Sequence, residues 1–585
     1  MKELKHLNKY FLKYKAHLVI GIIITIVARI FLLFTPRYVK EIFVVVEKYK
    51  NGPGGNIKGE LAEIIFYIIG AAIIAGILTF FMRQTIINVS RYIEFDLKNE
   101  VYEQYQKLSL NFYKKNRTGD LMNRISEDVG RVRMYAGPAI MYSINTVTLF
   151  VIALIYMFRE APLLTVYTIV PLPILSLAIY KLSKEIHKRS TVVQEYLSKL
   201  STYTQESFSG ISVIKAYGIE PLTSKNFDTL SATSKAKQIS LVKVQAWFFP
   251  MMILVIGVSN LLVIYIGGMQ YINGEIESLG TIAEFVIYVN MLTWPVATVG
   301  WVTSIVQQAE ASQKRINEFL KLEPEIKNTA QTHTDITGDI RFENVKFTYD
   351  DTNITALNGI SFSIKEGETL AILGKTGSGK STILDLIGRL YDIDEGHIVI
   401  NNLPIQDHNL TDLRNSIGYV PQDAFLFSDS IKNNIKFGKE DATDAEVIEA
   451  AKNAQVHKNI IDFNKGYDTV LGERGITLSG GQKQRVSIAR AIIKAPKILL
   501  FDDCLSAVDT ETEEKILKKL NKLTKGKTTI IVGHRVSSAK NADKIIVLDN
   551  GKIVQKGTHE SLINEDGYYQ HLYLKQSSET PSSSS

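Results

Sequence analysis

Six apolar stretches, nearly free of charge, limit what this chain can fold into more than any other feature of its sequence. A helix of about 20 residues crosses a hydrocarbon core of about 30 Å, so five of the stretches are long enough to span a membrane. The first becomes long enough if its helix continues past Thr35. Six spans place both ends of the chain on one side. The stretches cover residues 18–34 (with Arg29 inside), 64–82, 134–158, 161–180, 244–273 and 285–308.

The charge distribution predicts the orientation of these spans. The loop 47–60 carries lysines and must face outward, but the much more basic intervals 83–133 and 181–243 outweigh it. The net charge of +7 therefore reflects membrane topology and not nucleic-acid binding. One cysteine, Cys504, excludes an internal disulfide and fits a reducing cytosol. By the positive-inside rule the N-terminus is held in the cytoplasm by the lysines before the first span, Lys2, Lys5, Lys9, Lys13 and Lys15.

The two polar intervals between spans two and three and between spans four and five are much longer than the outward loops. Within the first interval, Ile93, Leu97 and Val101 recur at helical spacing, so helices are expected to extend well beyond the membrane. The soluble part begins near Gly338 with the alternation of an antiparallel strand. We therefore divide the chain into a transmembrane domain (1–308), a linker (309–337), a soluble domain (338–575) and a Ser-rich disordered tail (576–585).

A glycine-rich phosphate loop lies early in the soluble domain. Residues 374–381 read GKTGSGKS, a full G-x-x-x-x-G-K-[ST] pattern. The apolar run 369–373 precedes it and the helical pattern 382–387 follows it, so strand, loop and helix come in the required order. Glycines let backbone N–H groups converge on phosphates, and a lysine adds a point charge. Many unrelated nucleotidases carry this loop, so by itself it identifies only a phosphate site.

A second stretch, residues 478–509, supplies the complementary chemistry. It begins with LSGGQ, a turn that opens an amphipathic helix, and a helix N-terminus offers unpaired N–H groups and a positive dipole end to an anion. The apolar run 498–501 then ends in Asp502 and Asp503. A buried parallel strand delivers such carboxylates to its C-terminal edge, where Mg²⁺ and a water are expected.

Taken together, the LSGGQ element, the aspartate pair, the Ser506–Asp509 turn and the phosphate loop resemble the nucleotide-binding domain of ATP-binding-cassette (ABC) transporters. Long inward hairpins and short outward turns are similar to the exporter class of this family. The resemblance implies a multi-domain membrane protein, with a six-helix all-α transmembrane domain followed by an α/β P-loop nucleotide-binding domain. Because no internal duplication is visible, the chain is identified as a half-transporter, which must pair to work.

The resemblance also implies a role for each site residue, with ATP and Mg²⁺ as cofactors. Without it, a tyrosine at a strand end would be a packing residue, a glutamine in a turn a surface residue, and a histidine after a strand structural. The ATP-binding set is Tyr349, which stacks on adenine, together with Gly374, Lys375, Thr376, Gly377, Ser378, Gly379, Lys380, Ser381 and Thr382. The residues expected to contact the metal are Ser381, Gln422 and Asp502. The residues expected to be catalytic are Asp503, His534 and Gln422. The signature that acts on the partner's ATP is Leu478, Ser479, Gly480, Gly481 and Gln482, followed by Asp509 of the D-loop.

The sequence departs from the family pattern at Asp503, where functional members usually carry glutamate to polarise the attacking water. Aspartate keeps the charge but retracts the carboxylate by roughly 1.3–1.5 Å on standard C–C geometry. A misplacement near 1 Å can lower a rate about a hundredfold. The site is therefore expected to bind ATP well and to hydrolyse it poorly, while the intact signature completes a site on the partner. This asymmetry resembles heterodimeric bacterial multidrug exporters.

The expected function is ATP-driven efflux of hydrophobic or amphipathic compounds, drugs or lipids, across the cytoplasmic membrane. The expected partners are a second and different half-transporter, membrane lipid and a small hydrophobic substrate, with no nucleic acid. Both termini are expected in the cytoplasm. One alternative is a homodimeric lipid or glycolipid flippase, which a competent Asp503 would favour. The other is a nucleotide-gated channel or regulatory subunit, in which this site only binds.

Overall fold

The computed structural model describes residues 2–51, 56–330, 332–472, 475, 477–504, 512–513, 515–516, 518–519 and 526–579. The chain divides into two compact units. The membrane unit comprises Met1–Gln106 and Gly119–Leu322, and the soluble unit comprises Lys107–Thr118 and Glu323–Ser585. The short segment Lys107–Thr118 therefore belongs to the soluble unit although it lies far upstream in the sequence.

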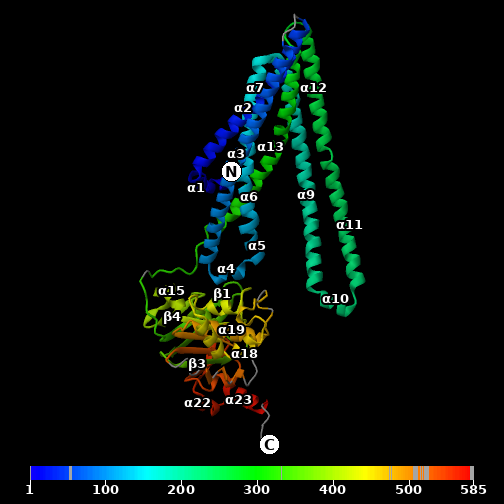
Figure 1. Ribbon diagram of the computed structural model, residues 1–585. Helices are drawn as coiled ribbons and strands as arrows, with labels where there is room; N and C mark the ends of the chain where they lie inside the picture. Colours follow the sequence, from blue (N-terminus) through cyan, green and yellow to red (C-terminus); the bar gives the residue numbers. More distant parts are fainter. Residues whose placement is uncertain are drawn as a thin grey trace. The chain divides into compact units, whose positions relative to one another are not determined.

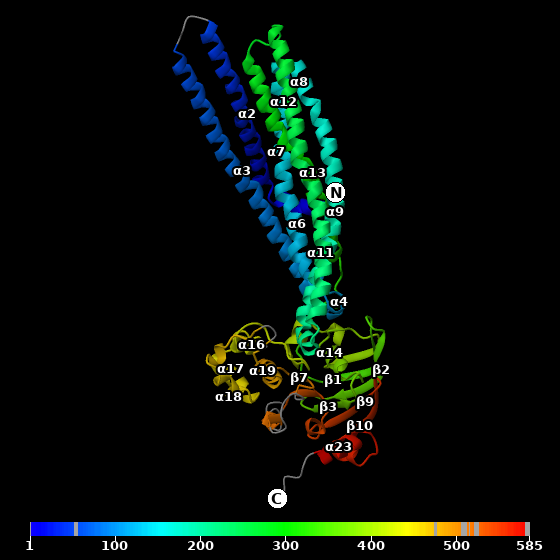
Figure 2. The ribbon, with the colours of Figure 1, turned by 90° about the vertical axis from the view of Figure 1, so that its right-hand side faces the viewer.

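The membrane unit is helical (Figures 1 and 2). Its helices are long because apolar stretches continue without a break into polar, helix-favouring ones. On α3, Ile93, Leu97 and Val101 are fully buried, which confirms the predicted helical rhythm. The helices are α1 (Asn8–Lys13), α2 (Lys15–Asn51), α3 (Ile57–Lys107), α5 (Thr118–Asn123), α6 (Val129–Met134), α7 (Ile140–Glu160), α8 (Pro162–Ile169), α9 (Pro171–Ser209), α10 (Ile211–Tyr217), α11 (Glu220–Gln245), α12 (Phe248–Ile272) and α13 (Leu279–Leu320).

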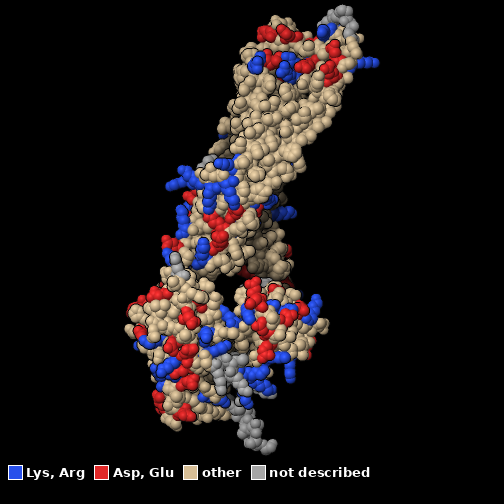
Figure 3. Space-filling view, turned by 60° about the vertical axis from the view of Figure 1, so that its left-hand side comes forward, with Lys and Arg blue, Asp and Glu red and all other residues tan. Residues whose placement is uncertain are grey.

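Within the described residues, five helical stretches are long and apolar enough to cross a membrane, and they match five of the six predicted spans. The remaining one, 161–180, is divided between α8 and the start of α9, with the break at Val170 and Pro171. Proline lacks the N–H that would continue the helical ladder, which gives this break a local cause. Figure 3 shows a broad uncharged band on the membrane unit, with charged residues at either end of it.

Apolar packing and an ion pair to a buried carboxylate hold helices of the membrane unit together. One core cluster joins α2, α7, α8, α12 and α13 through residues such as Leu33, Leu164 and Phe285. Nearer the soluble end, the guanidinium of Arg315 on α13 donates to both carboxylate oxygens of Asp128, which is almost fully buried. Breaking such a pair leaves an uncompensated buried charge, so it fixes α13 against its neighbours.

The hairpin formed by α9 and α11 ends in the short helix α10, and Figure 1 shows the two long helices side by side. Apolar side chains at this tip are largely exposed. Phe208 is 71% exposed, Val213 55% and Tyr217 78%. An exposed apolar tip of this kind is typical of a surface that docks on another subunit.

In the described part of the soluble unit, the strands form two sheets. The order in the first is β2-β1-β4-β5, antiparallel throughout, and the order in the second is β10-β9-β3-β8-β7-β6, parallel except for the edge strand β10. Strand β1, at the start of the soluble domain, confirms the antiparallel strand predicted near Gly338. The strands are β1 (Ile340–Tyr349), β2 (Ile354–Ile364), β3 (Thr369–Gly374), β4 (Glu395–Ile400), β5 (Leu403–Pro404), β6 (Ile417–Val420), β7 (Ile498–Asp502), β8 (Thr528–Val532), β9 (Lys544–Asp549) and β10 (Lys552–Gly557).

Helices surround the parallel sheet and carry the nucleotide motifs. A core of apolar residues from both sheets, including Phe342, Leu370 and Ile530, packs under α14. A second core joins β7 to α16, α17 and α19 through residues such as Ile431 and Val486. The helices of this unit are α4 (Leu110–Lys115), α14 (Lys380–Ile387), α15 (Leu410–Asn415), α16 (Ile431–Lys436), α17 (Asp444–Asn453), α18 (His457–Ile461), α19 (Gly480–Ile493), α21 (Val536–Ala539), α22 (His559–Ile563) and α23 (Tyr568–Glu579).

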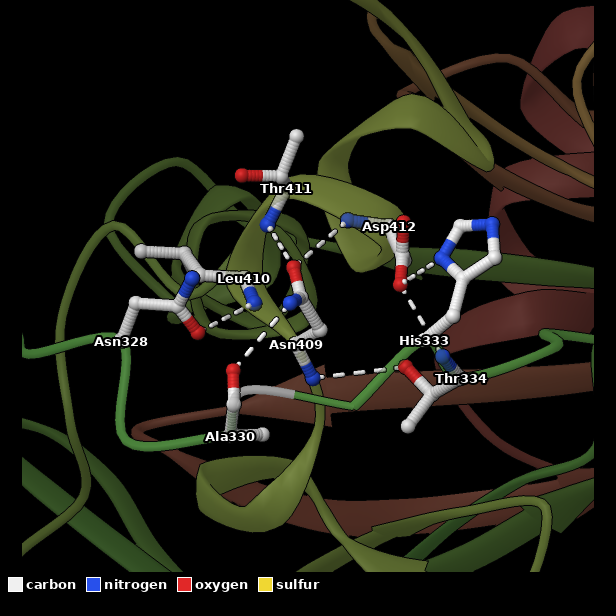
Figure 4. Close-up of polar contacts among 8 residues, drawn as sticks. All are labelled: Asn328, Ala330, His333, Thr334, Asn409, Leu410, Thr411 and Asp412. Carbon is white, nitrogen blue, oxygen red and sulfur yellow. Dashed lines mark hydrogen bonds and ion pairs between the residues drawn. The ribbon is translucent and has the colours of Figure 1, made fainter.

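The interval 309–337, predicted as a linker, divides between the two units. Helix α13 continues to Leu320, and the residues after Leu322 belong to the soluble unit. Polar side chains bind this segment to the start of α15 (Figure 4). Asn328 accepts from the Leu410 N–H at 3.0 Å, and the Asn409 amide donates to the Ala330 carbonyl at 3.1 Å.

Asp412 completes this attachment, because its carboxylate accepts from the Thr334 N–H at 2.9 Å and from the His333 ring at 2.5 Å (Figure 4). The side chains of Asn409 and Asp412 lie at the N-terminus of α15, where unpaired N–H groups and the helix dipole favour oxygen acceptors. Asn409 caps that terminus directly, accepting from Thr411 and Asp412. The segment after α13 is thus fixed on the soluble unit by specific bonds.

The tail predicted to be disordered covers residues 576–585, of which 580–585 lie outside the described residues. Helix α23 continues to Glu579, so the prediction was wrong for residues 576–579. Gln576 accepts from the Val536 N–H at 2.8 Å and donates to the His534 carbonyl at 3.0 Å. These bonds hold the last turns of α23 against the connection from β8 to α21, which composition alone does not reveal.

Candidate nucleotide-binding site

The predicted phosphate loop connects β3 to α14, which confirms the expected order of strand, loop and helix. Its two outer glycines are required by geometry. Gly374 has φ +151°, and a Cβ there would come within 2.2 Å of the Leu548 carbonyl oxygen. Gly379 has φ +96°, and its Cβ would come within 2.2 Å of the Ala356 carbonyl oxygen. Only glycine fits both positions, so the neighbouring strands impose the shape of the loop.

Lys380 is the first residue of α14 and is almost fully buried. Its ammonium donates to the carbonyl oxygens of Gly374 at 2.9 Å and Lys375 at 2.8 Å, so it lies inside the loop. Burial lowers the pKa of Lys380, while the carboxylates of Asp503 and Asp502 oppose that shift. A buried cation inside a ring of backbone groups is suited to a phosphate, which would supply the missing negative charge.

Ser381 and Asp502 meet at the sheet edge. The Ser381 hydroxyl donates to the Asp502 carboxylate at 2.8 Å. Asp502 ends the buried strand β7, and burial raises the pKa of its carboxyl group. A hydroxyl and a buried carboxylate side by side are hard oxygen donors of the kind Mg²⁺ prefers.

The buried hydroxyl of Ser378 has no hydrogen-bond partner in the described structure. An unpaired buried hydroxyl costs free energy unless a ligand satisfies it. This orphaned group, the glycine cradle and the Ser381–Asp502 pair all fit a bound nucleoside triphosphate with its metal. In contrast, Lys375, Thr376 and Gly377 are exposed on the outer side of the loop.

Tyr349 lies at the end of β1, next to the phosphate loop. Its hydroxyl is 3.0 Å from the Thr382 hydroxyl, which places the tyrosine beside α14. The Tyr391 ring packs edge to face against it at 5.5 Å, and the Lys114 ammonium lies 4.5 Å from the centre of the Tyr349 ring. Burial raises the pKa of Tyr349, which therefore stays neutral.

Sequence reasoning missed Lys114 and Tyr391 as neighbours of Tyr349. Lys114 comes from α4, in the segment Lys107–Thr118 that belongs to the soluble unit. The segment is fixed there by Asn111, which donates to the Glu325 carboxylate at 3.0 Å. No local sequence pattern predicts a contact between Lys114 and Tyr349, which lie far apart in the chain, so only the fold reveals it.

Asp385 is a second neighbour that the sequence did not single out. It lies on α14, and the Tyr419 hydroxyl donates to it over 3.5 Å. Burial first, and then the charge of Asp502, raise the pKa of Asp385 to about 6. The site therefore contains a carboxyl group that is partly protonated near neutral pH.

The three predicted catalytic residues follow the ends of neighbouring parallel strands. Asp503 comes directly after β7 with a positive φ of +40°, and its N–H donates to the Val532 carbonyl on β8 at 2.9 Å. His534 follows β8 by two residues, and its carbonyl accepts from Gln576. Gln422 follows β6, is exposed, and its carbonyl accepts from the Gln484 side chain at 3.0 Å. The carboxyl ends of β6, β7 and β8 thus bring these residues to the edge where β3 ends in the phosphate loop.

The LSGGQ element forms the N-terminus of α19. Ser479 caps the helix by accepting from the Gln482 N–H, and the Gln482 side chain accepts from the Ser479 N–H at 2.9 Å. This reciprocal capping box fixes the turn, while Leu478 is buried beneath it. Gly480 is exposed and Gly481 half-buried at the open helix end. The predicted D-loop residue Asp509 lies outside the described residues.

Comparison with protein families gives two matches. Residues 18–296 match the family described as ABC transporter transmembrane region, and residues 357–506 match the one described as ABC transporter. The two matched regions fall in the membrane unit and the soluble unit, respectively, apart from the segment at Lys107–Thr118.

Curated relatives align over nearly the whole chain. A probable multidrug resistance ABC transporter ATP-binding/permease protein of Bacillus subtilis is 36% identical over 98% of this chain and 97% of its own length. The multidrug resistance-like ATP-binding protein MdlA of Escherichia coli is 35% identical over 88% of each chain. An ATP-dependent lipid A-core flippase of Syntrophus aciditrophicus is 36% identical over 88% of this chain and 85% of its own.

The fold is also similar to that of a solved structure described as a bacterial Atm1-family ABC exporter with ATP bound. The TM-score is 0.80 at 26% identity, and the alignment covers 96% of this chain and 99% of that chain. The similarity therefore extends over both units.

Proposed function

Because this chain belongs to the ABC transporters, as an exporter half-transporter and an ATPase-coupled membrane protein, we propose that it exports hydrophobic or amphipathic compounds as one half of a heterodimer. In this proposal it contributes the weaker of two ATP sites. The single observation that carries the asymmetry is Asp503, the residue directly after β7.

ATP would bind across the phosphate loop. Tyr349 would stack on adenine, while Lys380 and the loop N–H groups would hold the phosphates. Ser381 and Asp502, already joined by a hydrogen bond, would hold Mg²⁺ together with Gln422. When bound, the ion supplies positive charge against the phosphate oxygens.

Asp503 would act as the base that orients the attacking water, and His534 would contact the terminal phosphate. The backbone of Asp503 is fixed, because its N–H is bonded to Val532 and its φ is positive. Because the backbone is fixed, it cannot shift to bring the aspartate carboxylate to the position that a glutamate carboxylate would reach. We therefore infer that this site binds ATP and turns it over slowly.

The signature would serve the other site. The capped N-terminus of α19 presents Ser479, Gly480 and Gly481 with the positive end of a helix dipole, as a phosphate requires. Nothing in this element departs from the family pattern. It would complete the partner's site, so the pair would keep one fully active ATP site.

The exposed tip of the α9–α11 hairpin supports a dimer. Val213 and Tyr217 of α10 are largely exposed. The soluble unit has a groove of about 360 Å³ whose lining includes Tyr419, Phe437 and Arg490. The lining also includes Leu384, Leu390, Ile417 and Leu500 beside the cations Arg414 and Lys494. The apolar part of this groove suits an apolar tip, and we propose that each subunit's tip docks in the other subunit's groove.

Closure of the two nucleotide domains on ATP would pull the docked hairpins and turn the cavity between the spans outward. Hydrolysis would reset it, so bound nucleotide biases a two-state equilibrium. The rigid α9 and α11 helices suit this role, because a long helix transmits displacement without absorbing it. The lysine-rich N-terminus supports an orientation in which both ends, and hence both soluble units, would lie on the cytoplasmic side of the membrane.

A second candidate is a homodimeric lipid flippase. It is favoured by the relative named as a lipid A-core flippase, which is as similar to this chain as the multidrug relatives. The two functions differ in whether the ATP site with Asp503 hydrolyses ATP fast enough in a dimer of identical chains.

Inside-out membrane vesicles test the proposal. Vesicles from cells that express the chain together with the other half-transporters of its source cell should accumulate an amphipathic fluorescent dye when ATP is added. Vesicles with Lys380→Met should not, because that variant lacks the buried cation of the phosphate loop. The tagged chain should copurify with a different half-transporter in a one-to-one ratio. Dye uptake equal in both vesicles, or a homodimer with full activity, would contradict the heterodimeric exporter.

A further inference from the structure

A lysine from the upstream segment of the soluble unit lies over the tyrosine that is expected to bind adenine. The Lys114 ammonium is 4.5 Å from the centre of the Tyr349 ring and 5.0 Å from the centre of the Tyr391 ring. The planes of the two rings are nearly perpendicular, at 89°. The ammonium is therefore close enough to both rings for each of them to attract it.

Bonds that do not involve Lys114 hold its helix, α4, on the soluble unit. The buried Asn111 amide donates to the Glu325 carboxylate at 3.0 Å and to the Asp350 carboxylate at 3.2 Å. Lys115 pairs with the same Asp350 carboxylate at 3.6 Å. The position of α4 thus has its own support, and the contact of Lys114 with the rings is a separate feature.

The other neighbours of Tyr349 are parts of the core. The Phe347 ring packs edge to face against it at 4.9 Å, and Phe347 and Tyr391 are only 4% and 7% exposed. The Thr382 hydroxyl, 3.0 Å from the Tyr349 hydroxyl, belongs to a buried residue of α14. Lys114 is exposed and has a long, flexible side chain. Of these four neighbours, the lysine is the one that can move away without opening the core.

A nucleobase and an ammonium use the same part of an aromatic ring. Bases stack on the face of a ring, and the negative potential of that face is what attracts a cation. A base that stacks on Tyr349 needs space that its present neighbours fill. Because the core rings are fixed, the space has to come from the lysine.

We propose that the Lys114 ammonium and the nucleobase of ATP compete for the Tyr349 ring. Without nucleotide the lysine covers the ring. When the base stacks, the ammonium leaves the ring, while Asn111 continues to hold α4. This inference rests on the proposed function, in which Tyr349 is the adenine platform, and it adds a residue that regulates that site. Lys114 thus lowers the affinity for ATP, and its release becomes a step of ATP binding.

Competition for the ring predicts an effect on ligands that carry a base and none on ligands that lack one. We would measure the affinity of the full chain in nanodiscs for ATP and for inorganic tripolyphosphate, which has three phosphates and no base. Both compete, in the presence of chelator, with a fluorescent ATP analogue that is titrated separately for each variant. The ratio of the ATP affinity to the tripolyphosphate affinity largely cancels the general attraction of a positive charge for phosphates.

Variants of the lysine test the contact through this ratio. Lys114→Met should raise the ratio about fivefold, which is the size expected for the loss of a cation–π contact. Lys114→Arg keeps the charge and also stacks on aromatic rings, so it should keep the ratio of the wild type. Lys114→Gln should act like Lys114→Met, and it replaces that variant if thermal unfolding shows that the methionine variant misfolds.

Two controls separate the ring contact from charge alone. Lys115→Met removes the same charge one residue further along α4, and it should leave the ratio within twofold of the wild type. In a Tyr349→Leu background, Lys114→Met should not change the ratio further, since the ring for which lysine and base compete is absent.

A ratio that stays unchanged or falls in both Lys114→Met and Lys114→Gln would overturn the proposal, as would an equal rise in Lys115→Met. If Tyr349→Leu leaves the ratio unchanged, the tyrosine is not the adenine platform and the competition is wrong with it. Failure of the proposed export looks different. If the ratio responds as predicted but vesicles show no ATP-dependent dye accumulation, export is wrong and the competition stands. If vesicles accumulate the dye and the ratio does not respond to Lys114, export stands and the competition is wrong.

Discussion

The buried carboxyl of Asp385 gives a prediction whose size follows from the structure. Burial and the charge of Asp502 raise its pKa from 3.8 to about 6. The folded chain therefore binds this proton more tightly than the unfolded chain, and ionisation opposes folding. The cost is absent below pH 3.8, grows as the pH rises, and is complete above pH 6. At about 1.4 kcal/mol for each pKa unit, it reaches about 3 kcal/mol at pH 7.5 and about half of that at pH 5.

Asp385→Asn removes this cost but keeps an oxygen that accepts from the Tyr419 hydroxyl. For a domain of this size, about 3 kcal/mol corresponds to a rise of about 6–12 °C in the unfolding temperature of the soluble unit. Calorimetry of the full chain in nanodiscs, without nucleotide and with chelator, measures that transition at both pH values. The exposed Asp351→Asn is the matched control and should shift it little. The reasoning is refuted if Asp385→Asn does not stabilise the chain, or stabilises it equally at pH 7.5 and pH 5.

Three further variants test other parts of the structure. Gly379→Ala should weaken ATP binding at least tenfold, measured with a fluorescent ATP analogue, since its Cβ would collide with the Ala356 carbonyl; unchanged affinity would contradict the geometry of the loop. Tyr217→Asp should lower ATP turnover of the assembled dimer about tenfold without changing ATP affinity, and normal turnover would remove α10 from the dimer contact. Asp128→Asn should lower the unfolding temperature of the membrane unit, because it weakens charge-assisted bonds to Arg315 worth up to about 3 kcal/mol; an unchanged transition would show that the pair adds nothing.

Local chemistry made much of the nucleotide site predictable. The spacing of glycines and lysine in the G-x-x-x-x-G-K-[ST] pattern predicted the phosphate loop together with its strand and helix. Gly374 and Gly379 have conformations that only glycine tolerates. The contact between Ser381 and Asp502 also agrees with expectation, because parallel strands end at a common edge. The roles assigned to these residues in ATP binding and hydrolysis remain predictions.

Contacts that depend on distant segments were not predictable. The sequence gives no sign that Lys114 reaches Tyr349, or that the segment after α13 binds the start of α15 through Asp412. In the sequence, only its prolines indicated a division of the fourth predicted span. They did not decide it, because a proline such as Pro171 can either kink a helix or end it. Burial of Asp385 likewise depends on the strands that pack against α14 and on Tyr419 of β6, which no pattern within α14 encodes.

The most direct test of the account is ATP turnover by the purified chain alone, in nanodiscs with Mg²⁺, beside Asp503→Glu. Lys380→Met supplies the background rate, because it lacks the cation of the phosphate loop. We predict that the wild type is close to background and that Asp503→Glu raises turnover at least tenfold, since the glutamate carboxylate reaches roughly 1.3–1.5 Å further. Wild-type turnover well above background and unimproved by glutamate would show that Asp503 is a competent base, and the homodimeric flippase would then replace the heterodimeric exporter.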